Sequence, residues 1–113
     1  MIVVTGAAGF VGQTVRKRLN ESGQKVLALT HGESFQSGHD EVSLDLNDPR
    51  HYESLGNYCK AADTLIHLAG LIPVTLAPGI DGDHRPRAAA QDFSGIYQSN
   101  VVMTARLLEF ALS

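Results

Sequence analysis

The sequence predicts an α/β fold in which helices cover both faces of a parallel sheet. Short apolar runs alternate with amphipathic or turn-rich segments, as expected for strands joined by crossover helices. The first apolar run, Ile2-Val3-Val4, leads into a turn with glycines at positions 6, 9 and 12, and an amphipathic run to Leu19 follows. A strand, a glycine-rich turn and a helix in this order are typical of a Rossmann-type doubly wound sheet.

The first part of the chain predicts two strands around one helix. Residues 2–5 are continuously apolar, as in a strand that is covered on both faces. A helix is expected over residues 10–22, where apolar residues recur every four positions and would form the buried stripe. They are Val11, Val15 and Leu19. Gly23 suits the position after this helix, and the second strand is expected at residues 25–30.

The middle of the chain predicts two further strands. Turn-forming residues across positions 31–41 indicate a loop. Strands are expected at residues 42–44 and 64–68. The segment between them predicts a helix over residues 49–58, with a proline in its first turn and Asp48 as its N-cap.

The segment after the fourth strand divides into a loop and a helix. Proline and glycine residues across positions 71–87 predict a long loop, which is uncommon in proteins unless it is functional or mobile. A last helix is expected over residues 88–112, where one face carries side chains at three- and four-residue spacing. That face comprises Phe93, Ile96, Tyr97, Asn100, Thr104, Leu107, Leu108 and Ala111.

Composition and charge indicate an ordinary soluble globular domain over residues 1–113, with 43% hydrophobic and 19% charged residues. A formal net charge of -3 argues against nucleic acid as a main partner. Cys59 is the only cysteine, and no apolar stretch is long enough to span a membrane, so we expect a cytoplasmic protein without a secretory signal. The five histidines show no paired ligand spacing, so no metal site is predicted.

The turn that begins at Gly6 has the features of a dinucleotide cradle. Gly6 allows a tight turn at the end of the first strand, Gly9 allows the backbone to approach a pyrophosphate, and Gly12 allows the helix to pack against the strands. The helix begins with Phe10 and Val11, and it points its free N–H groups and its positive dipole end toward the phosphates. The alternative is an ordinary glycine-rich turn that binds no ligand.

Four segments of the chain match motifs of one known family. Residues 5–12 resemble its Thr-Gly-x-x-Gly-x-x-Gly motif, and Asp45-Leu46 stand where the family has an aspartate that binds adenine. Residues 63–70 resemble its fourth-strand motif, which usually ends His-Leu-Ala-Ala. Residues 100–109 resemble its Asn-Val-x-Gly-Thr-x-x-Leu-Leu-Glu helix, with Met103 in place of the glycine. In this order and spacing, they resemble the extended short-chain dehydrogenase/reductases, the NAD-dependent epimerase/dehydratase group.

The resemblance implies binding roles for residues at the ends of the strands. Asp45 would accept a hydrogen bond from the adenine amino group, and Leu46 would pack beside the ring. Leu68, Ala69 and Gly70 would line the adenosine and ribose. Ligands collect at the carboxyl ends of parallel strands, which favours binding by Asp45 over its alternative as a surface aspartate in a turn.

Two polar residues lie in apolar surroundings. By the resemblance, Asn100 would support the active site near the nicotinamide. The alternative is a half-buried polar residue bonded to a loop, because asparagine is a poor helix former. His67 lies within an apolar strand, so a core histidine with satisfied hydrogen bonds is expected rather than a catalytic one.

The type of cofactor is left open between NAD and NADP. An NAD site usually has an acidic residue about 20 residues after the glycines, where it binds the ribose 2′-OH. The second strand ends instead with Thr30 and His31, and Glu33 comes slightly late. Thr30 and His31 could tolerate a 2′-phosphate, although no arginine is near, so the sequence favours NADP only slightly.

The catalytic pair of the family is missing from the sequence. Catalysis in the family requires a tyrosine with a lysine four residues later, which lowers the pKa of the tyrosine. Here Gly56, Ala62 and Val101 stand four residues after the three tyrosines. We therefore expect an N-terminal part of an oxidoreductase or sugar-nucleotide epimerase/dehydratase, truncated and not catalytic by itself. The alternative is a stand-alone dinucleotide-binding or interaction module.

The predicted sheet has an open edge. Right-handed crossovers give the strand order 3-2-1-4, which leaves the fourth strand without a neighbour on one side. An exposed edge invites pairing with another chain, and the last helix loses its normal partner helix, so its apolar stripe could seek burial between subunits. We therefore expect a homo-oligomer formed through the last helix or the edge of the fourth strand.

Overall fold

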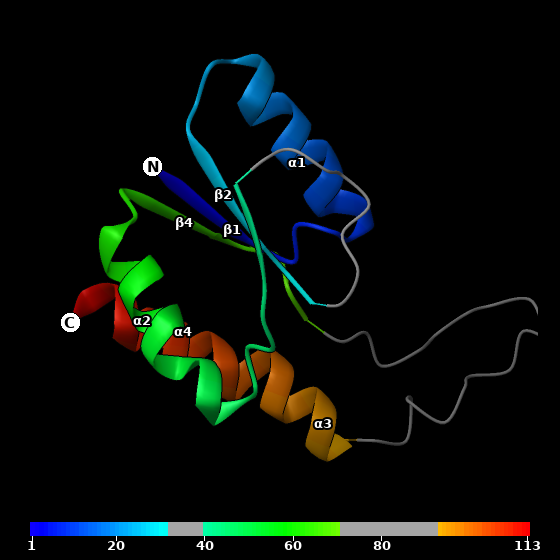
Figure 1. The fold of residues 1–113 in the computed structure, drawn as a ribbon. Coiled ribbons are helices and arrows are strands. Elements are labelled where there is room, and N and C mark those ends of the chain that lie inside the picture. The colour runs from blue at the N-terminus through cyan, green and yellow to red at the C-terminus, as the bar shows by residue number, and fades with distance from the viewer. Residues whose placement is uncertain (32–39, 71–92) are drawn as a thin grey trace, which may run out of the picture.

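The computed structural model describes residues 1–31, 40–70 and 93–113, and it contains a parallel sheet of four strands (Figure 1). The strands are β1 (Ile2–Thr5), β2 (Val26–Thr30), β3 (Glu41–Ser43) and β4 (Thr64–His67). The helical segments are α1 (Phe10–Glu21), the 3₁₀ turn η1 (Pro49–His51), α2 (Tyr52–Ala61), α3 (Phe93–Tyr97), the π-helical turn η3 (Gln98–Val102) and α4 (Met103–Leu112). The strand order is β3-β2-β1-β4, which confirms the predicted topology.

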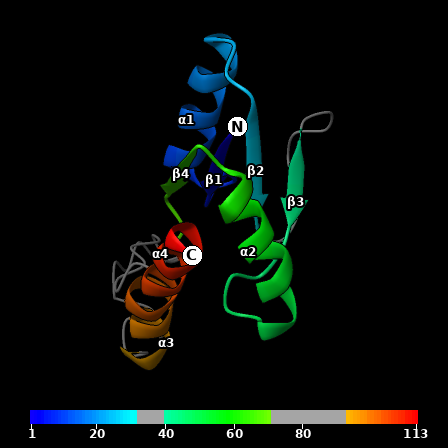
Figure 2. The same cartoon turned by 90° about the vertical axis from the view of Figure 1, so that its left-hand side faces the viewer.

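Helices lie on both faces of the sheet in the described part of the chain. Helix α1 covers one face, and α2 and α4 cover the other (Figure 1, Figure 2). Side chains alternate between the two faces along each strand. One cluster is formed by Val4, Ala7, Val26 and Ala28. The larger cluster on the opposite face is formed by Val3, Leu27, Leu29, Leu44, Leu55, Cys59, Met103 and Leu107. Burial on both faces explains why β1 and β2 are continuously apolar.

The buried side of α1 differs from the predicted stripe. Val11 is 57% exposed, so the prediction that it is buried was wrong, and the other two residues of the stripe are only partly buried. The buried residues of α1 are instead Gly12 and Arg16. Arg16 Nη1 donates to Glu41 Oε1 on β3 at 2.7 Å. Apolar periodicity could not reveal this arginine, because its burial depends on a partner that is distant in the sequence.

The boundaries of the middle elements lie close to the predicted ones. Asp48 caps η1 as predicted, since its Oδ1 accepts a hydrogen bond from Arg50 N at 2.9 Å. Helix α2 continues to Ala61, three residues beyond the predicted end, because Leu55 and Cys59 place its later turns in the core. Strand β1 has the predicted bounds, β2 begins one residue later than predicted, β4 ends one residue earlier, and β3 is shifted by one residue toward the N-terminus.

The last helix contains a π-helical turn that the sequence pattern did not indicate. A π turn holds more residues than an α turn and therefore changes which side chains face the core after it. Met103 and Leu107 are the buried residues of α4. Tyr97 and Leu108, which were predicted on the apolar face, are 60% and 58% exposed, so that part of the prediction was wrong.

Some expectations concern segments outside the described residues. These are positions 32–39 of the first loop, the loop predicted at 71–87 and the start of the last helix at 88–92. Among the helices that the structure describes, none is long and apolar enough to cross a membrane.

Candidate functional site

The turn after β1 brings three backbone segments into contact. Gly6 has a φ angle of +65°, and a Cβ atom there would lie 2.6 Å from Ala69 N and 2.7 Å from Leu68 C. Glycine is therefore required both by the backbone conformation and by the approach of the chain after β4. At Gly12 a Cβ atom would lie 2.1 Å from Gly6 O, so the first turn of α1 rests directly on the glycine turn.

The N-terminus of α1 has no capping side chain. Gly9 is its N-cap residue, and the first turn contains no acidic residue. An α-helix leaves its first N–H groups without intrahelical acceptors, and its dipole adds partial positive charge at the same place. This end of α1 is therefore suited to bind an anion.

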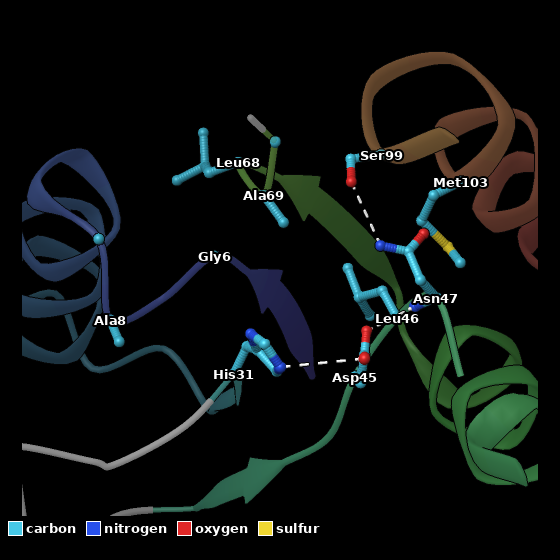
Figure 3. A pocket seen from close by; sticks show the side chains of 12 residues that line it. Gly6, Ala8, His31, Asp45, Leu46, Asn47, Leu68, Ala69, Ser99 and Met103 are labelled. Carbon is cyan, nitrogen blue, oxygen red and sulfur yellow. Dashed lines mark hydrogen bonds and ion pairs between the residues drawn. The ribbon is translucent and has the colours of Figure 1, made fainter. Parts of the chain in front are cut away.

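A cleft of about 450 Å³ lies beside the glycine turn, at the carboxyl ends of the strands (Figure 3). Its lining comes from the segments that follow β1, β2, β3 and β4, and from η3 and α4. The lining residues are Gly6, Ala8, Gly9, His31, Asp45, Leu46, Asn47, Leu68, Ala69, Gly70, Ser99 and Met103. Doubly wound sheets bind ligands at this place, outside the carboxyl ends of strands where the strand order reverses.

The structure brings most of the predicted binding residues together. Those that line the cleft are Gly6, Gly9, His31, Asp45, Leu46, Leu68, Ala69 and Gly70. Those that do not are Phe10, Val11, Gly12, Thr30 and Asn100. The Phe10 side chain is exposed, whereas Thr30 is buried and its hydroxyl has no hydrogen-bond partner among the described residues.

Four lining residues were not predicted from the sequence: Ala8, Asn47, Ser99 and Met103. Ala8 and Asn47 adjoin predicted binding segments in the sequence, and this adjacency is the signal that could have indicated them. Ser99 and Met103 reach the cleft from η3 and the start of α4 (Figure 3). Asn47 Nδ2 donates to Ser99 Oγ at 3.2 Å, which links the turn after β3 to η3. No sequence pattern indicated this contact.

The segment after β3 is ordered by local hydrogen bonds. Asp45 Oδ1 accepts from Asn47 N at 2.9 Å, and the Asp45 N–H donates to His51 Nδ1 at 2.9 Å. The other carboxylate oxygen of Asp45, Oδ2, lies 3.9 Å from His31 Nε2 (Figure 3). One oxygen of Asp45 thus stabilises the turn, while the other lies toward the side chain that follows β2.

His67 at the end of β4 connects β4 to β1 and α4. Its Nδ1 lies 2.6 Å from Thr5 Oγ1, and its Nε2 lies 2.9 Å from Thr104 Oγ1. Thr5 Oγ1 also accepts the N–H groups of Leu68 and Ala69, at 3.2 and 3.3 Å. Burial lowers the pKa of His67 and so favours the neutral ring. Both ring nitrogens have partners, as expected for a satisfied histidine in an apolar strand.

Asn100 lies in η3 at the edge of the cleft. Its backbone carbonyl oxygen accepts a hydrogen bond from Thr104 Oγ1 at 2.7 Å. A Cβ atom at Gly70 would lie 2.8 Å from Asn100 Oδ1, so the side chain of Asn100 packs against the backbone of a lining residue. The asparagine is exposed and stands next to the lining without forming part of it.

Solved structures of several proteins resemble this chain over almost its whole length. MoeE5 in complex with UDP-glucuronic acid and NAD is 31% identical, with a TM-score of 0.72, and the match covers 98% of this chain and 32% of that chain. A short-chain dehydrogenase/reductase superfamily protein from Agrobacterium tumefaciens with bound NAD is 29% identical, with a TM-score of 0.72 and coverage of 98% and 28%. Uronate dehydrogenase from Agrobacterium tumefaciens is 25% identical, with a TM-score of 0.67 and coverage of 98% and 35%.

The chain spans about a third of the length of these solved structures. A search of curated proteins found no match. Residues 2–113 match the model of the NAD dependent epimerase/dehydratase family, which is nearly the whole chain. The chain therefore belongs to the NAD-dependent epimerase/dehydratase family.

Proposed function

We propose that this chain binds a nicotinamide dinucleotide in the cleft and provides the cofactor-binding part of an oxidoreductase or a sugar-nucleotide epimerase/dehydratase. The observation that carries the proposal is the uncapped N-terminus of α1, which adjoins the glycine turn at the cleft. The presence of NAD in the structures of MoeE5 and of the Agrobacterium protein supports it.

The pyrophosphate of the dinucleotide would bind the first turn of α1. Its ligands would be the backbone N–H groups of Phe10, Val11 and Gly12, which belong to the uncapped end of the helix. Because the backbone and not the side chain acts in this role, the exposure of Phe10 and Val11 is compatible with it. The approach of a phosphate to this turn also requires the small residue Gly9.

The adenosine would occupy the part of the cleft between the segments after β3 and β4. Asp45 would accept a hydrogen bond from the adenine amino group through Oδ2, the oxygen that the turn does not use. Leu46 and Leu68 would contact the faces of the ring, and Ala69 and Gly70 would leave room for the ribose. Asn100 would support the nicotinamide end from the edge of the cleft.

NAD is the dinucleotide that the cleft favours. The described lining contains no lysine or arginine that could neutralise a 2′-phosphate, and it contains the carboxylate of Asp45. His31 is the one imidazole in that lining, and Thr30 is buried away from it. The charge of the lining therefore favours NAD, against the slight preference for NADP that the sequence suggested.

Hydride transfer would need residues that this sequence does not contain. The tyrosine–lysine pair of the family is absent from these 113 residues. We therefore expect binding without turnover when the chain is alone, which leaves a dinucleotide-binding or interaction module as the second candidate. The DNA after codon 113 discriminates between the two: an in-frame Tyr-x-x-x-Lys supports the enzyme, and a stop codon supports the binding module.

Self-association and a cytoplasmic location complete the proposal. Among the described strands, β4 has one neighbour, and the last helix exposes apolar side chains. The exposed ones are Tyr97, Val101, Leu108 and Leu112. The buried free thiol of Cys59 suits a reducing compartment. Analytical ultracentrifugation at micromolar concentration tests self-association, and a monodisperse monomer would contradict it.

Isothermal titration calorimetry tests dinucleotide binding directly. We expect NAD to bind with a lower Kd than NADP. Asp45→Ala should raise the Kd for NAD about tenfold, the loss expected for one hydrogen bond to a charged acceptor. Asp63→Ala is the matched control, because Asp63 pairs with the N-terminal amine at the other end of β4. Absence of NAD binding at millimolar concentration, or equal effects of the two substitutions, would refute the proposed site.

A further inference from the structure

The hydrogen bonds around His67 determine where each shared proton lies. The Thr104 hydroxyl donates to the Asn100 carbonyl, so its oxygen is left to accept from His67 Nε2. Thr5 Oγ1 accepts the two backbone N–H groups that follow β4, so its own hydrogen points to His67 Nδ1. A hydroxyl has one donor and two acceptor positions. The neutral ring with its hydrogen on Nε2 satisfies all of these bonds, and the other neutral tautomer does not.

Protonation of His67 would disturb this arrangement at Thr5. The new N–H at Nδ1 would need an acceptor, but both acceptor positions of Thr5 Oγ1 are filled. Leu68 N has a second acceptor in the carbonyl oxygen of Thr5 at 3.3 Å. For Ala69 N, the hydrogen bond that the structure shows is the one to Thr5 Oγ1 at 3.3 Å. The amide of Ala69 is therefore the group that protonation displaces.

Ala69 lies where such a displacement would alter the binding site. It lines the cleft, and its nitrogen would be 2.6 Å from a Cβ atom at Gly6, so its peptide packs against the glycine turn. We infer that neutral His67 holds the cleft wall formed by residues 68–70 against this turn through the Thr5 hydroxyl, so that dinucleotide affinity falls when His67 is protonated. His67 is thus a positioning residue, and the inference rests on the proposed dinucleotide site.

The charged groups near these elements do not replace His67 as the titrating group. The Met1 amine pairs with Asp63 at the ends of β1 and β4 that lie opposite His67. On α4, the Arg106 guanidinium stacks on an aromatic ring of α2, and Glu109 is exposed. The lowered pKa of His67 arises from burial. The neutral ring therefore dominates at neutral pH, and protonation acts below the ordinary histidine range near 6.5.

Calorimetric titration with NAD between pH 5.5 and 8 tests the inference. For the wild-type chain, we expect a constant Kd at high pH and a rise of up to tenfold per pH unit below the pKa of His67, because binding then requires release of one proton. His67→Asn is the discriminating variant, since its Oδ1 can accept from Thr5 but does not titrate. Its Kd should vary less than twofold across this range.

A control separates His67 from the exposed histidine of the cleft. The NAD titrations of the wild-type and His67→Asn chains are repeated with His31→Gln in both, so that the imidazole of His31 cannot contribute to the difference between them. Loss of affinity in parallel for the wild-type and His67→Asn chains would overturn the inference.

A ligand-free measurement separates failure of the inference from failure of the proposed function. In ¹⁵N NMR of the free protein, His67 should carry its hydrogen on Nε2, and the amide shift of Ala69 should follow the pKa of His67. If Ala69 does not respond, or if the hydrogen lies on Nδ1, the inference is wrong even where NAD binds. If Ala69 responds but NAD binds at no pH, the proposed function and the affinity change both fail, while the link from His67 to the wall stands.

Discussion

The close packing of Gly12 against the glycine turn predicts that Gly12→Ala destabilises the chain. A Cβ atom at Gly12 would lie 2.1 Å from Gly6 O and 2.8 Å from Ala7 Cα, and both atoms belong to backbone. Cβ contacts under 3.0 Å essentially do not occur, so α1 would have to move about 1 Å away from the glycine turn. That movement would also shift the N–H groups that we propose bind the pyrophosphate.

The expected loss of stability in Gly12→Ala is the balance of two opposing contributions. Overpacking typically costs about 1–3 kcal/mol and occasionally more, and a backbone clash belongs at the upper end. Alanine regains about 1 kcal/mol relative to glycine within a helix. We therefore expect Gly12→Ala to lower the free energy of unfolding by about 2 kcal/mol and the Tm by roughly 8 °C in a domain of this size. The Kd for NAD should rise at least about tenfold, because the site depends on the position of the helix end.

Gly56→Ala is the matched control, since Gly56 is also a buried glycine within a helix. Its Cβ would lie 3.9 Å from a side-chain atom of Phe110, which is an ordinary contact. Alanine should stabilise the chain here by up to about 1 kcal/mol, without a change in the Kd for NAD. Thermal unfolding and calorimetric titration of both variants test the reasoning. A Gly12→Ala chain that is as stable as wild type would refute it.

Three further predictions concern the packing around the site. The side chains of Arg16 and Glu41 are 4% and 10% exposed, so Arg16→Met would leave the buried carboxylate of Glu41 without its cation. Urea unfolding should show a loss of about 3 kcal/mol in the free energy of unfolding. Adding Glu41→Leu in a double variant should restore much of that loss. A loss under about 0.5 kcal/mol would contradict this. Asp48→Ala should lower the Tm at pH 6 because it removes the cap of η1. Hydrogen bonding to the neighbouring arginine lowers the pKa of Asp48 from 3.8 to about 2, so its stabilisation is present above pH 3.8, and the difference in Tm should vanish as the pH falls through 2. Leu107→Ala should cost about 2–5 kcal/mol in urea unfolding, whereas Leu108→Ala on the exposed side should be nearly neutral, and equal losses would refute the observed register of α4.

Much of the candidate site could be predicted because it depends on backbone requirements that leave a mark in the sequence. The conformation of Gly6 and the close approach at Gly12 admit glycine alone, so the turn is visible as a spacing of glycines. Asp45 and the residues after β4 were assigned through the family resemblance, and their position after apolar strands supports that assignment. The carboxyl ends of parallel strands meet at one edge of the sheet.

The missed residues depend on contacts between segments that are distant in the sequence. Arg16 is buried because Glu41 pairs with it across α1 and β3, whereas local periodicity predicted Val11 on the buried side. Ser99 and Met103 reach the cleft through a π-helical turn, and α-helical spacing does not anticipate the shift that such a turn introduces. The same shift explains why Leu108, which follows the turn, is exposed.

The sequence by itself determined the parallel sheet, its strand order and the glycine turn, because these follow from local apolar patterns, glycine geometry and the handedness of crossovers. Only the tertiary structure decided how His67 is bonded, which ion pair is buried and which side chains close the cleft. His67 is bonded where β1, β4 and α4 meet, and the buried ion pair joins α1 to β3. The free energy of a buried polar group is set by partners that the folded chain alone brings within reach.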